Sequence, residues 1–265
     1  MKRCETLWNT VKHTEDFDTY YRNIWQERWD ALKSSFEGES DYCTLSEGLL
    51  KPYFLDRASI YPAKALGVQS GDTVLDLCAA PGGKTLILAL AKGEAGPLVA
   101  NDKSADRRGR LKAVVAEHLP ASIASTVHIT GYDAATWGLY QKDMYDKVLL
   151  DAPCSSERHV LSSPYYLAQW TPARTRQLAI RQFAMLAAAL DAAKAGGRVV
   201  YSTCSISPLE NDGVVEKLFK KRKDMFDIVD MEPEIGEKTK YGIQILPDTT
   251  GAGPIYYCCL EKRHG

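Results

Sequence analysis

Apolar and polar positions follow two different periods along this chain, and after residue 72 the two patterns alternate. Short apolar runs bounded by turn residues are typical of buried strands, and apolar positions recurring every three or four residues are typical of amphipathic helices. Strands are predicted at 73–79, 97–102, 126–131, 146–151 and 197–203, and helices at 83–92, 104–118, 172–194 and 207–222. This order predicts a doubly wound α/β fold with a mostly parallel sheet.

The tail of the chain supplies two more strand patterns, at 226–231 and 254–262. The second alternates with period two and is compatible with an antiparallel strand added late. The expected sheet therefore has seven strands, in an order that resembles the Rossmann-like plan of class I methyltransferases.

The first fifty residues have a different pattern. Aromatic and aliphatic residues recur at helical spacing among charges from 14 to 36, which predicts an amphipathic helix. We interpret its aromatic stripe as docking on the main domain, with an RNA-stacking surface as the alternative. Residues 35–43 are the expected linker, and 52–72 is expected to form one helix that ends at Gly67. The predicted domains are a helical N-terminal extension, 1–50, packed on a core at 51–265.

Composition narrows the function classes. The net charge of −1 means that any nucleic-acid surface must be a local patch. Seven cysteines, with no C-x-x-C pair, favour a reducing compartment and disfavour a zinc site, so no metal is expected. The N-terminus lacks an apolar signal region and no apolar run reaches membrane-spanning length, so we expect a cytoplasmic protein.

A glycine-bearing turn follows the first predicted strand, in the string LDLCAAPGGKT at 75–85. Gly82 and Gly83 let the backbone approach a ligand closely, and the helix that starts at Lys84 favours negative charge such as a carboxylate. A phosphate-binding loop is excluded because the required first glycine is replaced by Cys78. The string therefore predicts a cofactor loop.

Acids end three successive strands. Asp102 can bind ribose hydroxyls, as the acid after the second strand does in dinucleotide folds. Asp133 can accept from an adenine amine, and Asp151 ends the fourth strand. Each acid alone is more often a solvated strand end or a helix cap, but three in succession favour a nucleotide-type cofactor.

Two cysteines also follow strand patterns. Cys154 lies in DAPCSSERH, 151–159, and Cys204 in YSTCSISPLEN, 201–211. Because ligands bind at the carboxyl ends of parallel strands, the two thiols and the cofactor loop should meet at one sheet edge. This combination favours methyl transfer with a cysteine nucleophile. A free cysteine is usually an inert core residue, and the residues alone do not rank the two thiols.

Together with NDKSADR, 101–107, these strings resemble successive motifs of the Nol/Nop/Sun (Sun/Fmu) family of RNA cytosine-5 methyltransferases over residues 50 to 260, in a compact form without an extra RNA-binding domain. The resemblance implies an S-adenosylmethionine-dependent enzyme in which Cys204 is the nucleophile and Cys154 assists product release. It places Asp151 against the base and the cofactor, with Lys84 as the cation that lowers the pKa of the thiol. The implied cofactor-binding residues are Cys78, Ala79, Ala80, Pro81, Gly82, Gly83, Lys84, Asp102, Arg107, Asp133 and Asp151.

Alternatives remain at this point. DNA cytosine-5 methyltransferases use the Pro-Cys thiol, which would be Cys154, and a non-catalytic RNA-binding or ribosome-assembly factor could keep the same fold. The expected substrate is structured rRNA or tRNA, with the assembled ribosomal subunit or a helper protein as a further partner of a monomeric chain. The expected RNA surface combines aromatic and basic residues: Tyr165, Tyr166, Trp170, Arg174, Arg176 and Arg181.

Overall fold

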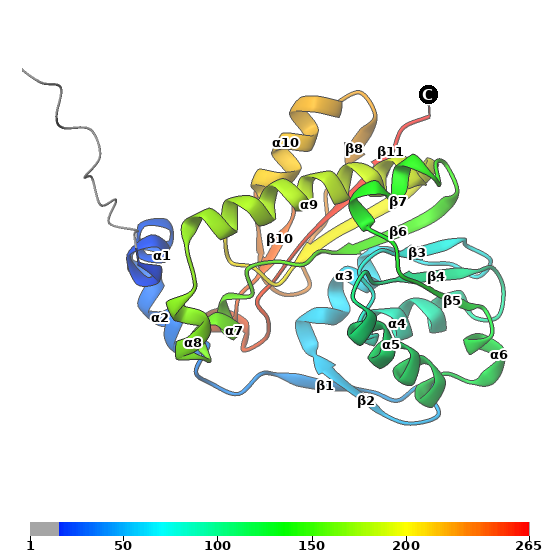
Figure 1. Cartoon of the computed structure of the whole chain (residues 1–265), viewed down its shortest axis with the longest axis horizontal. Helices are drawn as coiled ribbons and strands as arrows, with labels where there is room; N and C mark the ends of the chain where they lie inside the picture. Colours follow the sequence, from blue (N-terminus) through cyan, green and yellow to red (C-terminus); the bar gives the residue numbers. More distant parts are fainter. Residues whose placement is uncertain (1–15, 265) are drawn as a thin grey trace, which may run out of the picture.

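The computed structural model of the chain describes residues 16–264, and within them a nine-stranded sheet forms the centre of the molecule (Figure 1). The strand order is β5-β4-β3-β6-β7-β11-β10-β9, and β8 pairs with β11 off this path. The bounds are β3 Val74–Asp76, β4 Leu98–Asn101, β5 Val127–Thr130, β6 Tyr145–Asp151, β7 Ala193–Thr203, β8 Phe226–Ile228, β9 Glu237–Lys238, β10 Ile243–Ile245 and β11 Ile255–Lys262.

The first five strands of this sheet are parallel to one another, as predicted. β11 runs antiparallel to β7, and the predicted late antiparallel strand is therefore confirmed. The α/β fold class is confirmed as well, with the short strands β9 and β10 added to the seven that were expected. The register pairs Asp151 with Ser202, so the carboxyl ends of β6 and β7 lie side by side.

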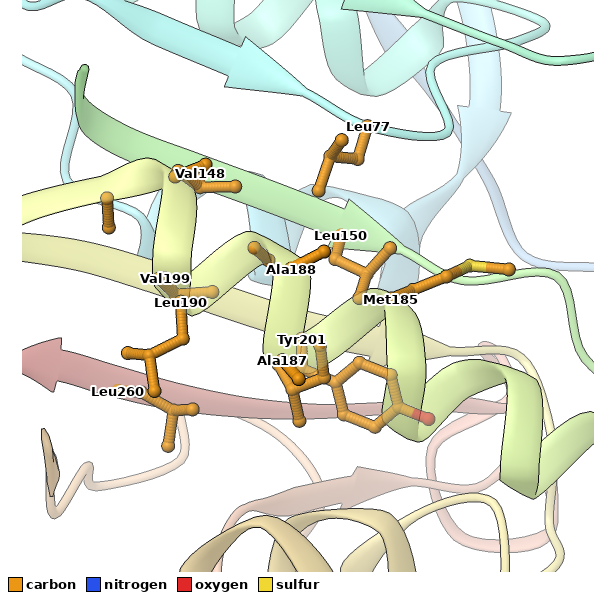
Figure 2. Close-up of a cluster of buried hydrophobic side chains, with 14 of the residues drawn as sticks. Leu77, Val148, Leu150, Met185, Ala187, Ala188, Leu190, Val199, Tyr201 and Leu260 are labelled. Atoms are coloured by element: carbon orange, nitrogen blue, oxygen red, sulfur yellow. The ribbon is translucent and has the colours of Figure 1, made fainter. Parts of the chain in front are cut away.

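Helices cover both faces of the sheet (Figure 1). One face carries η3 (Ala134–Leu139), α9 (Pro172–Ala192) and α10 (Asp212–Arg222); the other carries α3 (Ile60–Ala65), α4 (Gly83–Lys92), α5 (Ala105–His118) and the short α6 (Ala121–Ala124). Figure 2 shows α9 packing onto the sheet, with Met185 and Leu190 facing Leu150 and Val199. Cys258 and Cys259 belong to the cores on opposite faces, as expected from the strand period.

The N-terminal segment consists of α1 (Phe17–Trp25), a 3-10 turn η1 (Gln26–Arg28) and α2 (Trp29–Ser35). The single helix predicted from 14 to 36 is wrong in its continuity, because Gln26 has a φ of 52° and breaks it; residues 14–15 lie outside the described part. The docking interpretation is confirmed: Phe17, Tyr21 and Trp29 are buried in a cluster with residues of the main domain.

The helix predicted at 52–72 is wrong in its first part, although α3 does end before Gly67, which has a φ of 63°. Residues Tyr53–Asp56 form β2, which pairs antiparallel with β1 (Tyr42–Leu45), so the expected linker also runs into a strand. The inner face of β2 packs against the domain and buries Leu55, while Phe54 faces outward. This alternation of buried and exposed side chains favours a strand over a helix at 53–56. Helix begins only at Ile60, after a 3-10 turn η2 at Arg57–Ser59.

Three boundaries or placements also differ from expectation. β7 starts at Ala193, because its first residue pairs with Tyr145, and the preceding helix therefore ends at Ala192. The helix expected from 207 starts at Asp212, after a turn. Trp170 is not a surface residue. It is buried between α8 (Pro164–Ala168) and α9, where its ring contacts Phe17 and Tyr20 at centroid distances of 5.0 and 5.2 Å.

No helix among residues 16–264 has the length and apolar character needed to cross a membrane.

Replacing Trp170 by alanine should lower the free energy of unfolding by about 3 to 5 kcal/mol, because it removes a buried ring and leaves a cavity between α1 and the main domain. Tyr165→Ala, at an exposed position on α8, should change it by less than about 0.5 kcal/mol. Denaturant unfolding measures both. Equal stability of the two variants would contradict the packing described here.

Candidate active site

The two thiols meet at the carboxyl ends of β6 and β7. Cys154 Sγ and Cys204 Sγ are 2.9 Å apart, within hydrogen-bond distance. Ser156 Oγ lies 3.2 Å from Cys204 Sγ and 3.6 Å from Cys154 Sγ. Among the described residues that line the adjoining cavity of about 470 Å³, Cys204 is present and Cys154 is not. Cys204 is thus the thiol that faces an open space.

Hydrogen bonding separates the ionisation of the two sulfurs. The contact with Cys154 lowers the pKa of Cys204 against the opposing effect of burial, and the Ser156 hydroxyl lowers it further. The same contact, together with burial, raises the pKa of Cys154 well above its usual value. Cys154 therefore keeps its proton, which can form a hydrogen bond to the Cys204 sulfur, and Cys204 is the more readily ionised thiol of the pair.

Asp151, the last residue of β6, is held by two donors. Its Oδ2 accepts from Lys84 Nζ at 2.8 Å and its Oδ1 from Ser202 Oγ at 2.7 Å. Burial alone would lower the pKa of Lys84, but the charges of Asp151 and Cys204 outweigh it, and the pKa is raised. Lys84 thus stays cationic beside the thiol pair, and its predicted lowering of the thiol pKa stays a prediction.

The cofactor loop lines a pocket that reaches Asp151. Its lining comprises Tyr53, Leu55, Ser59, Asp76, Cys78, Ala79, Ala80, Pro81, Gly83, Lys84 and Asp151. Gly82 has a φ of 128°, and a Cβ there would lie 2.8 Å from Val114 Cγ1. A Cβ on Gly83 would lie 2.9 Å from Tyr53 Cε1. Both glycines are therefore required for the loop to pack closely between α5 and β2.

A buried acid beneath this loop has free acceptor capacity. Asp76 Oδ2 accepts from Thr85 Oγ1 at 2.7 Å, whereas its buried Oδ1 has no hydrogen-bond partner within residues 16–264. Burial raises the pKa of Asp76 to about 7. A bound ligand with an N–H or O–H group would satisfy this oxygen, so the pocket fits a polar cofactor end such as an amino acid.

The second acid of the predicted set lies beside the loop. Asp102 is buried, its Oδ1 accepts from the Ser104 backbone, and its Oδ2 has no hydrogen-bond partner within the described part of the chain. Arg107 Nη1 lies 3.5 Å from Asp102 Oδ2, and Arg107 Nη2 donates to the Ala80 carbonyl. The free Oδ2 suits a ribose hydroxyl.

Asp133 is placed differently. It ion-pairs with Lys103 at 2.7 Å and Arg181 at 3.2 Å, and it lines a separate cavity of about 540 Å³ with Tyr132 and Trp137. The other ten predicted cofactor residues lie at or beside the loop. Asp133 lies beside the end of β4, because its neighbour Tyr132 forms two hydrogen bonds with the Asn101 side chain and its own carboxylate binds Lys103. Arg181, which was expected on the RNA surface, takes part in the ion pair with Asp133.

The cavity at Cys204 is bordered by α7 (Glu157–Leu161) and by the turn before β11. Arg158 fixes that border by donating to the Gly253 and Gly38 carbonyls, each at 3.0 Å. His159, which also lines the cavity, packs its ring against Tyr166 at a centroid distance of 4.6 Å. Exposed aromatic rings thus stand at the mouth of the cavity.

Two buried acids escaped the sequence reasoning. Glu157 and Glu210 are fully buried and accept hydrogen bonds from Ser155 and Ser205, the residues that follow the two thiols. The available signal was an acid three residues after Cys154 and another six residues after Cys204, inside the same motifs. Tyr53 and Tyr21 gave no such signal, because they are distant in sequence from the motifs.

Within residues 16–264 no group of three or more His, Cys, Asp or Glu could hold a metal ion.

A mostly parallel α/β sheet with a glycine-bearing loop, strand-end acids and paired thiols defines a class of group-transferring enzymes with a nucleotide-type cofactor. The family model described as 16S rRNA methyltransferase RsmB/F matches residues 63–261, and the chain belongs to this family. The resemblance to Nol/Nop/Sun proteins is thereby confirmed.

Two curated relatives show the level of similarity. Mouse "5-cytosine rRNA methyltransferase NSUN4" is 40% identical over 235 residues, covering 82% of this chain and 61% of its own. The zebrafish "tRNA (cytosine(34)-C(5))-methyltransferase, mitochondrial" is 42% identical over 235 residues, covering 81% and 62%. The chain therefore spans about three fifths of the length of these relatives.

Solved structures agree with the fold. NSun6 from Pyrococcus horikoshii, determined with SFG, superimposes with a TM-score of 0.69 at 26% identity, covering 81% of this chain and 54% of that one. A methyltransferase homolog from the same organism gives a TM-score of 0.74 at 22% identity, covering 91% and 93%, and supports the fold alone.

The pH dependence of thiol alkylation tests the ionisation of the pair. Cys204 should react with iodoacetamide with a midpoint below that of Cys43, whose pKa is raised by burial. Cys154→Ala should move the Cys204 midpoint upward, because it removes the hydrogen-bond donor. Peptide mass spectrometry across pH follows each site. An unchanged Cys204 midpoint in Cys154→Ala would contradict this assignment.

Gly82→Ala should weaken cofactor binding by roughly tenfold or more, because the loop must abandon its positive φ and move away from Val114. Gly109→Ala is the matched control, since a Cβ there meets nothing within 4 Å and α5 gains helix propensity. Calorimetric titration with S-adenosylmethionine and thermal unfolding measure both variants. Wild-type affinity in Gly82→Ala would show that the loop does not hold the cofactor.

Proposed function

We propose that this protein transfers a methyl group from S-adenosylmethionine to carbon 5 of a cytosine in structured RNA. The observation that carries the proposal is the contact between Cys154 and Cys204, with Cys204 facing an open cavity beside the cofactor loop. Membership of the methyltransferase family supports it, and so do relatives whose names specify cytosine-5 methylation of rRNA or tRNA.

The chemistry explains the need for a thiolate. Carbon 5 of cytosine is a poor nucleophile until the Cys204 sulfur adds to carbon 6, forming a carbon–sulfur bond and giving carbon 5 the character of an enamine. S-adenosylmethionine would bind at the loop and supply the electrophilic methyl group; carbon 5 forms a bond to that methyl as its bond to sulfur breaks, which leaves S-adenosylhomocysteine. A base removes the hydrogen at carbon 5, and its electron pair restores the double bond and expels Cys204 as a thiolate.

The neighbours of Cys204 suit the two ends of this cycle. Cys154 keeps its proton at 2.9 Å and can donate a hydrogen bond to the departing thiolate, which supports its proposed part in product release. Asp151 is fixed by Lys84 and Ser202 between the thiols and the loop pocket, where it can meet both the base and the cofactor. These assignments extend the family pattern to this chain.

Cofactor fit rests on acceptors that lack partners. Asp76 Oδ1 and Asp102 Oδ2 are buried and unsatisfied within residues 16–264, at the two ends expected for an amino-acid group and a ribose. The solved NSun6 relative contains SFG, an S-adenosylmethionine analogue, which supports the same cofactor here. Asp133, whose carboxylate also binds the exposed cations Lys103 and Arg181, keeps its proposed contact with the adenine amine.

The RNA surface we propose lies around the cavity mouth. Tyr165 and Tyr166 are exposed on α8, and Arg174 and Arg176 are exposed at the start of α9. Aromatic rings and guanidinium groups suit stacking on unpaired bases and contact with phosphate. The target cytosine must leave its stack to reach Cys204. Four further points stay predictions: an rRNA or tRNA substrate, a ribosomal subunit or helper protein as partner, a monomeric state and a cytoplasmic location.

The test uses wild type, Cys204→Ala and Cys154→Ala with labelled S-adenosylmethionine and total RNA, followed by nucleoside analysis and denaturing gels. Wild type should form 5-methylcytidine, Cys204→Ala should lose it by at least about a thousandfold, and Cys154→Ala should accumulate a gel-stable RNA adduct. Cofactor binding without methylation of any RNA or ribosomal particle would instead favour the binding-factor alternative. Methylation of DNA but not RNA would favour a DNA cytosine-5 methyltransferase.

A further inference from the structure

One buried carboxyl group connects the turns that carry the two thiols. Glu210 Oε2 accepts from the backbone N–H of Ser155 at 3.0 Å, and Glu210 Oε1 accepts from the Ser205 hydroxyl at 3.1 Å. The Ser155 hydroxyl also donates to Glu210 Oε1. Ser155 follows Cys154 and Ser205 follows Cys204, so a single side chain holds the residue next to each sulfur.

A second buried carboxyl extends this connection to the N-terminal helix. Glu157 Oε1 accepts from the Ser205 hydroxyl at 2.8 Å and from the Tyr21 hydroxyl at 2.5 Å. Glu157 Oε2 accepts from the backbone N–H of Ile206 at 3.2 Å. Tyr21 is fully buried on α1. A hydrogen-bonded chain therefore runs from α1 to the turn after Cys204.

The charge of this pair is balanced by hydrogen bonds alone. Within residues 16–264 the partners of Glu157 and Glu210 are hydroxyl, amide and backbone N–H groups, with no cation. The Ser205 hydroxyl has one proton and cannot donate to both acids at once. Burial and the charge of Glu210 raise the pKa of Glu157 to about 7, so the pair retains a proton.

Each member of this network depends on the others for its hydrogen bonds. A buried donor or acceptor that loses its partner pays the desolvation cost of that group, and this holds the surrounding backbone in one geometry. Here the backbone held is that of the two thiol turns. A small displacement of either turn would lengthen the 2.9 Å contact on which the ionisation of Cys204 depends.

We propose that Tyr21, Glu157, Ser205 and Glu210 form a positioning chain that sets the separation of the Cys154 and Cys204 sulfurs, which makes α1 a functional part of the active site. None of the four touches a reacting atom, so all four are positioning residues. The catalytic meaning of this chain rests on the proposed function, but the positioning itself does not.

The decisive variant is Tyr21→Phe, which removes one hydroxyl and keeps the buried ring. We expect kcat for methyl transfer to fall about tenfold. KM for S-adenosylmethionine should stay unchanged, because none of the four residues of the positioning chain lines the cofactor pocket. The second readout needs no RNA: diamide takes two electrons and two protons from the thiols to form a Cys154–Cys204 disulfide. Its rate should fall several-fold, since it depends on the distance between the sulfurs.

Tyr140→Phe is the matched control, because Tyr140 is 83% exposed, follows the last residue of η3 and takes no part in the positioning chain; both readouts should stay at wild-type values. Ser205→Ala interrupts the same chain at its centre and decides the question if Tyr21→Phe does not fold. Wild-type kcat and disulfide rate in the folded variants would overturn the proposal. Slower disulfide formation in an enzyme that methylates no RNA would uphold the positioning chain and refute only the proposed function.

Discussion

The parallel pairing of β6 with β7 is the constraint on which the site depends. Its register sets Asp151 opposite Ser202, and the chain leaves both strands at the same edge of the sheet. The two thiols, which are fifty positions apart in sequence, are thereby brought to 2.9 Å. β3, paired with β6 on its other side, delivers the cofactor loop to the same edge. Thiols, acid and loop are consequences of three adjacent parallel strands.

Polar groups around this edge are arranged in two layers. The layer that faces the pockets contains Cys204, Asp151 and Lys84, and the charges of Asp151 and Cys204 keep Lys84 cationic, whereas Asp151 raises the pKa of Cys204. The layer beneath contains Glu157 and Glu210, which bind the turns and no cation among the described residues. Two buried acids without a counter-ion are costly, and a fold that needs only stability would gain by replacing them. Their hydrogen bonds to both thiol turns are consistent with the proposed positioning of the two sulfurs.

Much of this arrangement could be predicted from the sequence, because buried parallel strands and strand-end motifs are local signals. The loop at Cys78–Lys84, the acids Asp102 and Asp151 and both thiols lie where their strands predicted. The sequence did not rank Cys154 and Cys204, because their difference arises from Ser156 and from an open cavity on one side only.

The failures of prediction share a physical cause, which is contact between distant segments. Residues 52–56 have helical spacing, but the buried Leu55 and the partly buried Tyr53 pack against the cofactor loop, and this packing selects a strand. Trp170 resembles a surface aromatic until α1 covers it. Tyr21 has no motif of its own.

The central claim is that Cys204 is the sulfur that bonds to the cytosine. RNA in which 5-fluorocytidine replaces cytidine should trap the enzyme after methyl transfer, because the fluorine at carbon 5 cannot leave as a proton does. Protease digestion of the trapped wild-type complex, followed by peptide mass spectrometry, identifies the attached residue. The account predicts a nucleotide and methyl adduct on Cys204 with Cys154 unmodified. An adduct on Cys154 would contradict it.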